Sequence, residues 1–109
     1  MSELKELTDI INAFNHERDW EQFHNAKDLA IALSIEANEL LEVYLWKQSN
    51  EAPIEKVKEE LADVFHCAIM LASKYDFDIK EIVLEKLAKT AMKYPVEKAK
   101  GNSKKYDEL

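Results

Sequence analysis

Apolar side chains recur every three or four residues along most of this chain, which is the period of an amphipathic α-helix. Leu4, Leu7 and Phe14 begin the pattern. It predicts four helices, over about residues 2–18, 26–47, 53–75 and 79–94. No stretch shows the alternation of apolar and polar residues that is typical of a half-buried strand. We therefore expect an all-α fold, arranged as a four-helix bundle.

The segments between these helices are short. Residues 19–25 mix aromatic and polar side chains without a period, so we expect a loop there. Pro53 suits the first turn of the third helix, and Pro95 stops the fourth. With 109 residues, 47% of them apolar, the chain can form one domain with a modest core. We expect this domain to span residues 1–109, with a polar C-terminal tail from about residue 96.

Two pairs of carboxylates interrupt the apolar stripes of the second and third predicted helices. The pairs are Glu36 with Glu39, and Glu60 with Asp63. Side chains three residues apart share a helix face, and the short link between these helices makes them antiparallel neighbours. Four acids at close range cannot all stay ionised without a cation, because each raises the pKa of the others. Oxygen ligands suit Mg²⁺ or Mn²⁺, so the pattern predicts a divalent-metal site.

Other interpretations of these residues remain open. Glutamate is common on helices, and a single Glu-x-x-Glu pair is also typical of a solvated face. Two such pairs on successive core-facing stripes are more specific. Asp63-x-x-His66 faintly resembles the Glu-x-x-His motif of di-iron bundles, which requires that motif on two helices. This chain would meet the requirement only through a partner subunit.

The net charge of −7 is unevenly distributed along the chain. Residues 1–85 carry 19 acidic side chains against 8 basic ones, whereas residues 86–105 hold seven lysines and one glutamate. A strongly acidic body disfavours binding to long nucleic acid. The lysine-rich segment either helps to hold a small polyanion or only supports a helix C-terminus and solubility.

Several absences narrow the class of protein further. A single glycine excludes the Gly-rich loops that cradle phosphates or dinucleotides. The lone Cys67 cannot form an internal disulfide. The N-terminal residues lack the basic and apolar segments of a signal peptide, and no run is long enough to span a membrane. We expect a reduced, cytoplasmic protein that does not bind membranes.

Taken together, the motifs resemble those of the all-α MazG-like nucleoside triphosphate pyrophosphohydrolases. Glu36-x-x-Glu39, a spacer of twenty residues and Glu60-x-x-Asp63 resemble the signature of that family. The segments 17–24, 45–47 and 93–96 resemble the dCTP pyrophosphatase branch more closely. The resemblance covers nearly the whole chain, from about residue 14 to residue 106.

The resemblance implies Mg²⁺-dependent cleavage of a nucleoside triphosphate to the monophosphate and pyrophosphate; the oxygen ligands would also accept Mn²⁺ as a substitute. It implies that Glu36, Glu39, Glu60 and Asp63 are metal ligands. A carboxylate that the metal does not fully engage, Glu36 or Glu39, is the candidate general base. The resemblance also implies a homo-oligomer, a dimer or a dimer of dimers. The apolar run 61–72 agrees, because a helix that is apolar nearly all round is expected to be covered.

Aromatic, imidazole and lysine side chains are the candidates for substrate contacts. The indole rings suit stacking on a base, and two lysines seven apart share one helix face. The opposite interpretation is that the first indole only pins its loop onto the bundle. The candidate substrate-binding residues are Trp20, His24, Trp46, Lys86, Lys93 and Tyr94.

Two positions depart from the animal dCTP enzymes. Cys67 stands where they have a tyrosine, and Thr90 stands where they have an asparagine. Both changes shrink side chains that are expected near the sugar or base. They leave the predicted reaction type unchanged but leave the identity of the base open. We expect dCTP or a related or modified deoxynucleotide as the substrate. A non-catalytic nucleotide or metal sensor, and a purely structural helical module, remain as alternatives.

Overall fold

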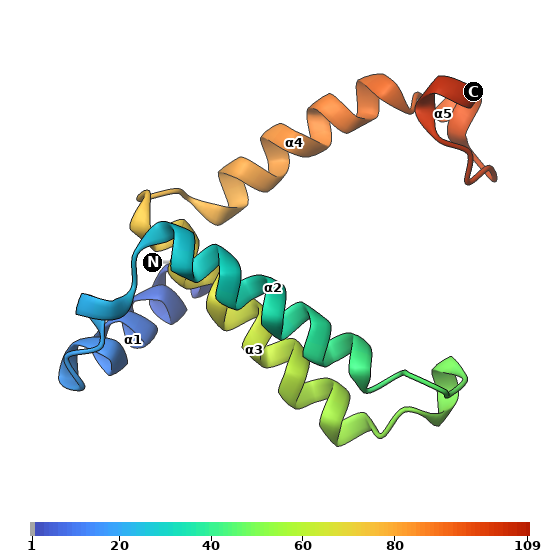
Figure 1. Cartoon of the computed structure of the whole chain (residues 1–109). Helices are drawn as coiled ribbons and strands as arrows, with labels where there is room; N and C mark the ends of the chain where they lie inside the picture. Colours follow the sequence, from blue (N-terminus) through green and yellow to red (C-terminus); the bar gives the residue numbers. More distant parts are fainter. Residues whose placement is uncertain (1) are drawn as a thin grey trace. The chain divides into compact units, whose positions relative to one another are not determined.

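The structure is a computed structural model that describes residues 2–109. In this range it contains helices and no strand, which confirms the all-α prediction (Figure 1). The chain divides into two compact units, and the second begins at Phe77.

Three helices form the first unit: α1 (Glu3–Glu17), α2 (Ala26–Glu42) and α3 (Ile54–Lys74). Side-chain caps set the first two starts, because Ser2 Oγ accepts from the backbone N–H of Lys5 at 3.1 Å and Asn25 Oδ1 accepts from that of Asp28 at 2.9 Å. A short link joins α2 to α3, so the two pack side by side as an antiparallel hairpin (Figure 1). Helix α1 packs against α3.

The first unit has a small core. Its buried apolar side chains are Leu29 on α2 and Cys67, Ile69 and Ala72 on α3. These positions belong to the apolar stripes that the sequence pattern predicts. The core therefore holds α2 against the C-terminal half of α3, while the carboxylates lie closer to the middle of the hairpin.

Helix α2 is shorter than the sequence predicts. It ends at Glu42 rather than at Lys47, because the chain tightens into turns that bond three residues back. The N–H groups of Tyr44 and Leu45 donate to the carbonyls of Leu41 and Glu42, at 2.9 and 3.3 Å. Trp46 then adopts a positive φ of 66°, which a continuing α-helix does not allow.

The second unit contains α4 (Ile79–Lys93) and α5 (Val96–Ala99). Asp78 caps α4, because its Oδ1 accepts from the backbone N–H of Glu81 at 2.9 Å. Helix α5 corrects the prediction of four helices, because it lies in the segment that was expected to be only a polar tail. Pro95 allows this extra turn, because its carbonyl accepts from the N–H groups of Lys98 and Ala99. None of the helices in residues 2–109 is long and apolar enough to cross a membrane.

Candidate functional site

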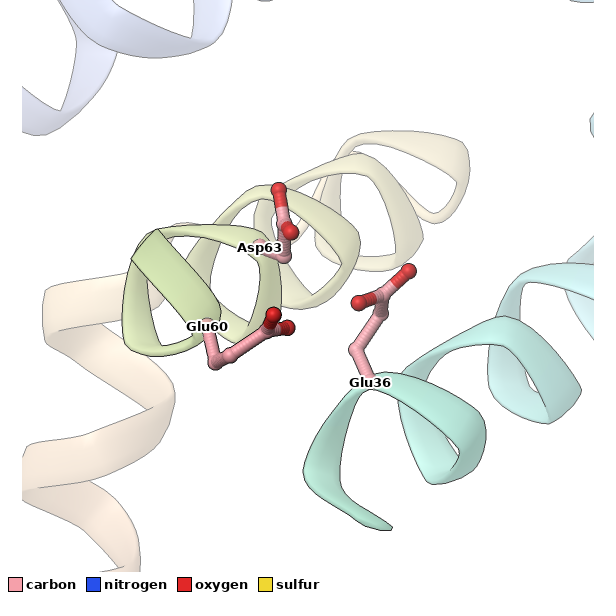
Figure 2. Close-up of side chains that lie close together, drawn as sticks. All are labelled: Glu36, Glu60 and Asp63. Atoms are coloured by element: carbon pink, nitrogen blue, oxygen red, sulfur yellow. The ribbon is translucent and has the colours of Figure 1, made fainter. Parts of the chain in front are cut away.

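Three carboxylates from two helices meet in the middle of the α2–α3 hairpin (Figure 2). Glu36 comes from α2, and Glu60 and Asp63 come from successive turns of α3. Each residue contributes one carboxylate oxygen, and these three oxygens all lie within 4.8 Å of one another. Helical spacing explains the arrangement, since residues three apart share one face and the antiparallel partner faces it. We refer to these three residues as the acidic cluster.

The negative charge of the acidic cluster is not compensated by a positively charged group within the cluster. Oε2 of Glu36 and Oε2 of Glu60 are buried and accept no hydrogen bond within the described chain. Burial raises the pKa of Glu36, and the neighbouring carboxylates Glu39, Asp63 and Glu60 raise it further. Burial also raises the pKa of Glu60, with smaller contributions from Glu39 and Asp63. Hard oxygen ligands of this kind fit a divalent cation such as Mg²⁺ or Mn²⁺, which would supply the missing charge.

Glu39, the fourth predicted ligand, lies outside the set of oxygens that share the 4.8 Å limit. It lines an adjoining cavity of about 330 Å³ together with Lys47, Lys56 and Glu60. The two lysines were not among the predicted site residues. Lys56 precedes Glu60 by one helical turn, and it opposes the rise in the pKa of Glu60. That four-residue spacing is the feature of the sequence from which Lys56 could have been predicted as a site residue.

A second cavity, of about 280 Å³, lies between α1, the loop 18–25 and the ends of α2 and α3. His24 is one of its lining residues, as is Glu21, which accepts a 2.6 Å contact from His16 Nδ1. The structure therefore places His24 at a cavity. Its other lining residues are Asn12, Asn15, Leu29, Met70, Ser73 and Lys74.

The two tryptophans occupy different environments. The Trp20 ring meets the Phe14 ring edge-on, with centroids 5.8 Å apart, and Arg18 stacks over Phe14 at 3.6 Å. Trp20 thus packs on α1, as the pinning interpretation expects, and it remains 45% exposed. Trp46 is fully exposed beyond the end of α2. Neither ring lines the two cavities described here.

The remaining predicted substrate contacts lie in the second unit. Lys86 and Lys93 are both exposed on α4, and Tyr94 is the residue that ends it. Lys93 Nζ lies 4.7 Å from the centre of the Tyr106 ring, and Tyr94 meets the same ring edge-on at 6.1 Å. The Tyr106 ring therefore contacts both side chains and restrains them at the end of α4, a role that the sequence pattern did not indicate.

Two residues beside the acidic cluster also have notable environments. His66 Nε2 is buried and has no hydrogen-bond partner in the described chain, yet His66 does not join the cluster. Cys67 is a buried free thiol. Burial raises the pKa of Cys67, and the charges of Glu36 and Asp63 raise it further. The thiol is thus a small core side chain next to the carboxylates.

This helical hairpin with paired carboxylates belongs to a known class. The sequence model of the MazG-like family matches residues 31–109, so the chain is a member of that family. Among individual relatives, human dCTP pyrophosphatase 1 is 36% identical over 97% of this chain and 67% of its own length. The mouse dCTP pyrophosphatase 1 is 34% identical with the same coverage.

A solved structure agrees with the family assignment. The crystal structure of a pyrophosphatase from Archaeoglobus fulgidus superposes with a TM-score of 0.81 at 34% identity. The match covers 87% of this chain and 94% of that one. The all-helical fold of this chain is therefore that of a MazG-like pyrophosphatase.

Proposed function

We propose that this protein is a nucleoside triphosphate pyrophosphohydrolase that converts dCTP, or a closely related deoxynucleotide, to the monophosphate and pyrophosphate. The acidic cluster carries the proposal. Two of its oxygens are buried without a partner in the described chain, and the relatives of this chain include proteins named as pyrophosphatases. The names of the human and mouse relatives support dCTP as the first substrate to test.

The proposed metal ligands are Glu36, Glu39, Glu60 and Asp63. When bound, a divalent cation such as Mg²⁺ would offset the triphosphate charge and activate the attacking water. The chain itself orients these carboxylates, because the packed hairpin fixes which helical turns face each other. Without a cation, the same acidic surface would repel a triphosphate.

Glu39 is the better candidate for the general base, with Glu36 as the alternative. Glu39 lies outside the group of three but within hydrogen-bond reach of Glu36 and Glu60, and it also lines a cavity that could hold the attacking water. Lys47 and Lys56 line the same cavity and are suited to the phosphate oxygens that leave as pyrophosphate. In the second unit, Lys86 and Lys93 are proposed phosphate contacts, with Tyr94 supporting Lys93.

Trp20, Trp46 and His24 are the proposed contacts to the nucleoside. His24 lines the 280 Å³ cavity, which supports its role directly. Trp46 is fully exposed at the end of the metal-binding helix, so its ring is free to stack on a ligand. Trp20 already packs on Phe14 and would offer only its exposed face.

We also propose that the protein works as a homo-oligomer, a dimer or a dimer of dimers. The first unit exposes two apolar pairs, each one helical turn apart: Ile31 with Ile35 on α2, and Leu61 with Phe65 on α3. These side chains are 40–59% exposed, and a second copy of the chain would cover them. The family match crosses both units, which supports treating residues 1–109 as one functional domain. Its buried free cysteine suits a reducing compartment such as the cytoplasm.

Product analysis with purified protein, Mg²⁺ and a panel of single nucleoside triphosphates tests the proposal. We expect monophosphate and pyrophosphate, formed fastest from deoxycytidine nucleotides. Diphosphate and phosphate would contradict the cleavage position. Asp63→Asn should abolish turnover, whereas Glu59→Gln, a change at an exposed neighbour, should not. Nucleotide binding without turnover of any nucleotide would favour the sensor alternative.

A further inference from the structure

We infer that Asn15 selects the base of the substrate, by accepting a hydrogen bond from the exocyclic amine of cytosine. This inference rests on the proposed function and adds the residue, and the chemical rule, by which the base is chosen. Asn15 is 4% exposed and is the buried polar residue of the first unit. It lines the 280 Å³ cavity that also contains His24.

The cavity lies at a suitable distance from the acidic cluster. Leu29 and Met70 line it, and they are seven residues from Glu36 and Asp63 respectively. Seven residues make two helical turns, about 10 Å along the axis, and return to nearly the same helix face. A nucleotide whose phosphates lie at the acidic cluster can therefore extend its base toward this cavity along the α2–α3 hairpin.

The contact with Met70 fixes which end of the Asn15 amide faces the sulfur. Asn15 Nδ2 lies 3.2 Å from Met70 Sδ. A thioether accepts hydrogen bonds and never donates them, so the amide must turn its NH₂ group toward the sulfur. The amide oxygen is then directed away from Met70, and it is the acceptor that Asn15 offers to a ligand.

A second polar pair lies one helical turn away. Asn12 Nδ2 donates to Ser73 Oγ at 3.1 Å, and both residues line the cavity. Because Ser73 Oγ accepts this bond, its O–H hydrogen remains available as a donor. The two pairs, Asn15 with Met70 and Asn12 with Ser73, are three residues apart on both helices. This spacing of about 4.5 Å places an acceptor and a donor across the width of a base edge.

An acceptor beside a donor distinguishes cytosine from uracil. Cytosine presents an amine at position 4 and a carbonyl at position 2, which suit Asn15 and Ser73 in that order. Uracil presents a carbonyl at position 4, which would face the Asn15 oxygen without a hydrogen between them. Sites that leave a buried polar group unpaired reject such an analogue more strongly than apolar sites do.

The test compares dCTP with dUTP, which share sugar and triphosphate, in the full-length protein with Mg²⁺. We expect the native protein to prefer dCTP in kcat/KM. Asn15→Leu should lower kcat/KM for dCTP by about tenfold to hundredfold and change dUTP far less. Asn38→Leu, the same change at an exposed asparagine on α2, is the matched control and should alter neither.

Met70→Leu provides a second variant that keeps the side-chain volume and so should fold. Without the sulfur, the Asn15 amide can turn its NH₂ group into the cavity and donate to uracil. We expect turnover of dUTP to rise and the ratio of kcat/KM for dCTP to that for dUTP to fall. An equal loss for both nucleotides in Asn15→Leu, with no relaxation in Met70→Leu, would show that Asn15 only packs and would overturn the inference.

Binding of dCMP and dUMP, measured by calorimetry, separates this inference from the proposed function. A native protein that cleaves dCTP and dUTP equally well overturns the inference and leaves the function intact. A protein that cleaves no nucleotide overturns the function. In that case a preference for dCMP that is lost in Asn15→Leu still supports the role of Asn15, and equal binding of both monophosphates refutes it.

Discussion

Replacing Glu36 by glutamine should stabilise the metal-free protein and at the same time remove its response to divalent metal. Oxygens of Glu36, Glu60 and Asp63 lie within 4.8 Å of one another. At that distance two unit charges repel by about 0.9 kcal/mol in water and by about 3.5 kcal/mol at an effective dielectric constant of 20. Glu36 is partly exposed, so solvent screening favours the lower end. We expect a gain of about 1 kcal/mol in the free energy of unfolding, which corresponds to about 4 °C.

Thermal unfolding in EDTA and in Mg²⁺ measures both effects. The native protein should melt at a higher temperature in Mg²⁺ than in EDTA. Bound metal adds up to about 2.7 kcal/mol to the free energy of unfolding when its concentration is one hundred times its Kd. Glu36→Gln should have a higher melting temperature than the native protein in EDTA, should show little further increase in Mg²⁺, and should lack turnover. Glu59→Gln removes an equal charge from an exposed position and should show the native response.

A lower melting temperature for Glu36→Gln in EDTA would refute this reasoning. It would mean that the carboxylate makes a stabilising contact in the metal-free protein. An undiminished Mg²⁺ response in the variant would separately refute the role of Glu36 as a ligand. The two results are independent, because one is read without metal and the other is a difference between conditions.

Three further outcomes are expected. The fold raises the pKa of Glu36 and of Glu60, so it favours their protonated forms. Their favourable contribution to the free energy of unfolding is therefore fully present below the ordinary carboxyl pKa of about 4.3, and it is lost as pH rises through the folded pKa. The urea midpoint in EDTA should therefore fall less with acid in the native protein than in Glu36→Gln, so the gap between them closes at low pH. Cys67 is buried with a raised pKa, so a thiol reagent at neutral pH should react at least tenfold faster in urea, and equal rates would contradict its burial. Trp46→Ala should change the free energy of unfolding by less than about 0.5 kcal/mol and raise KM for the nucleotide, whereas an unchanged KM would argue against stacking.

The acidic cluster was predictable from the sequence because helical geometry is local. Residues three apart share a face in any α-helix, and a short link forces the next helix to run antiparallel beside it. Glu36, Glu60 and Asp63 therefore meet as the spacing indicates. The same rule could have pointed to Lys56, one turn before Glu60, but the charge pattern drew attention to the C-terminal lysines and Lys56 was not predicted.

Other parts of the site depend on turns and on distant contacts, which carry weaker signals. Helix α2 ends early because the chain tightens after Glu42 into turns that bond three residues back, and the spacing of Leu40 and Val43 does not predict this change. The contact between Asn15 and Met70 joins positions 55 residues apart. Periodicity assigns each of them to its own helix but does not align one helix with the other.

The α2–α3 hairpin carries the acidic cluster and also part of the 280 Å³ cavity that is proposed to hold the base. Leu29 on α2 and Met70 on α3 line this cavity about two helical turns from the acidic cluster, while α1 and the loop 18–25 supply the rest of its lining. The repulsion within the cluster opposes folding in the absence of metal, and the small buried core must offset it. A chain selected only for stability would place apolar residues at Glu36 and Glu60, and the proposed cation site gives a functional reason for carboxylates at these core-facing positions.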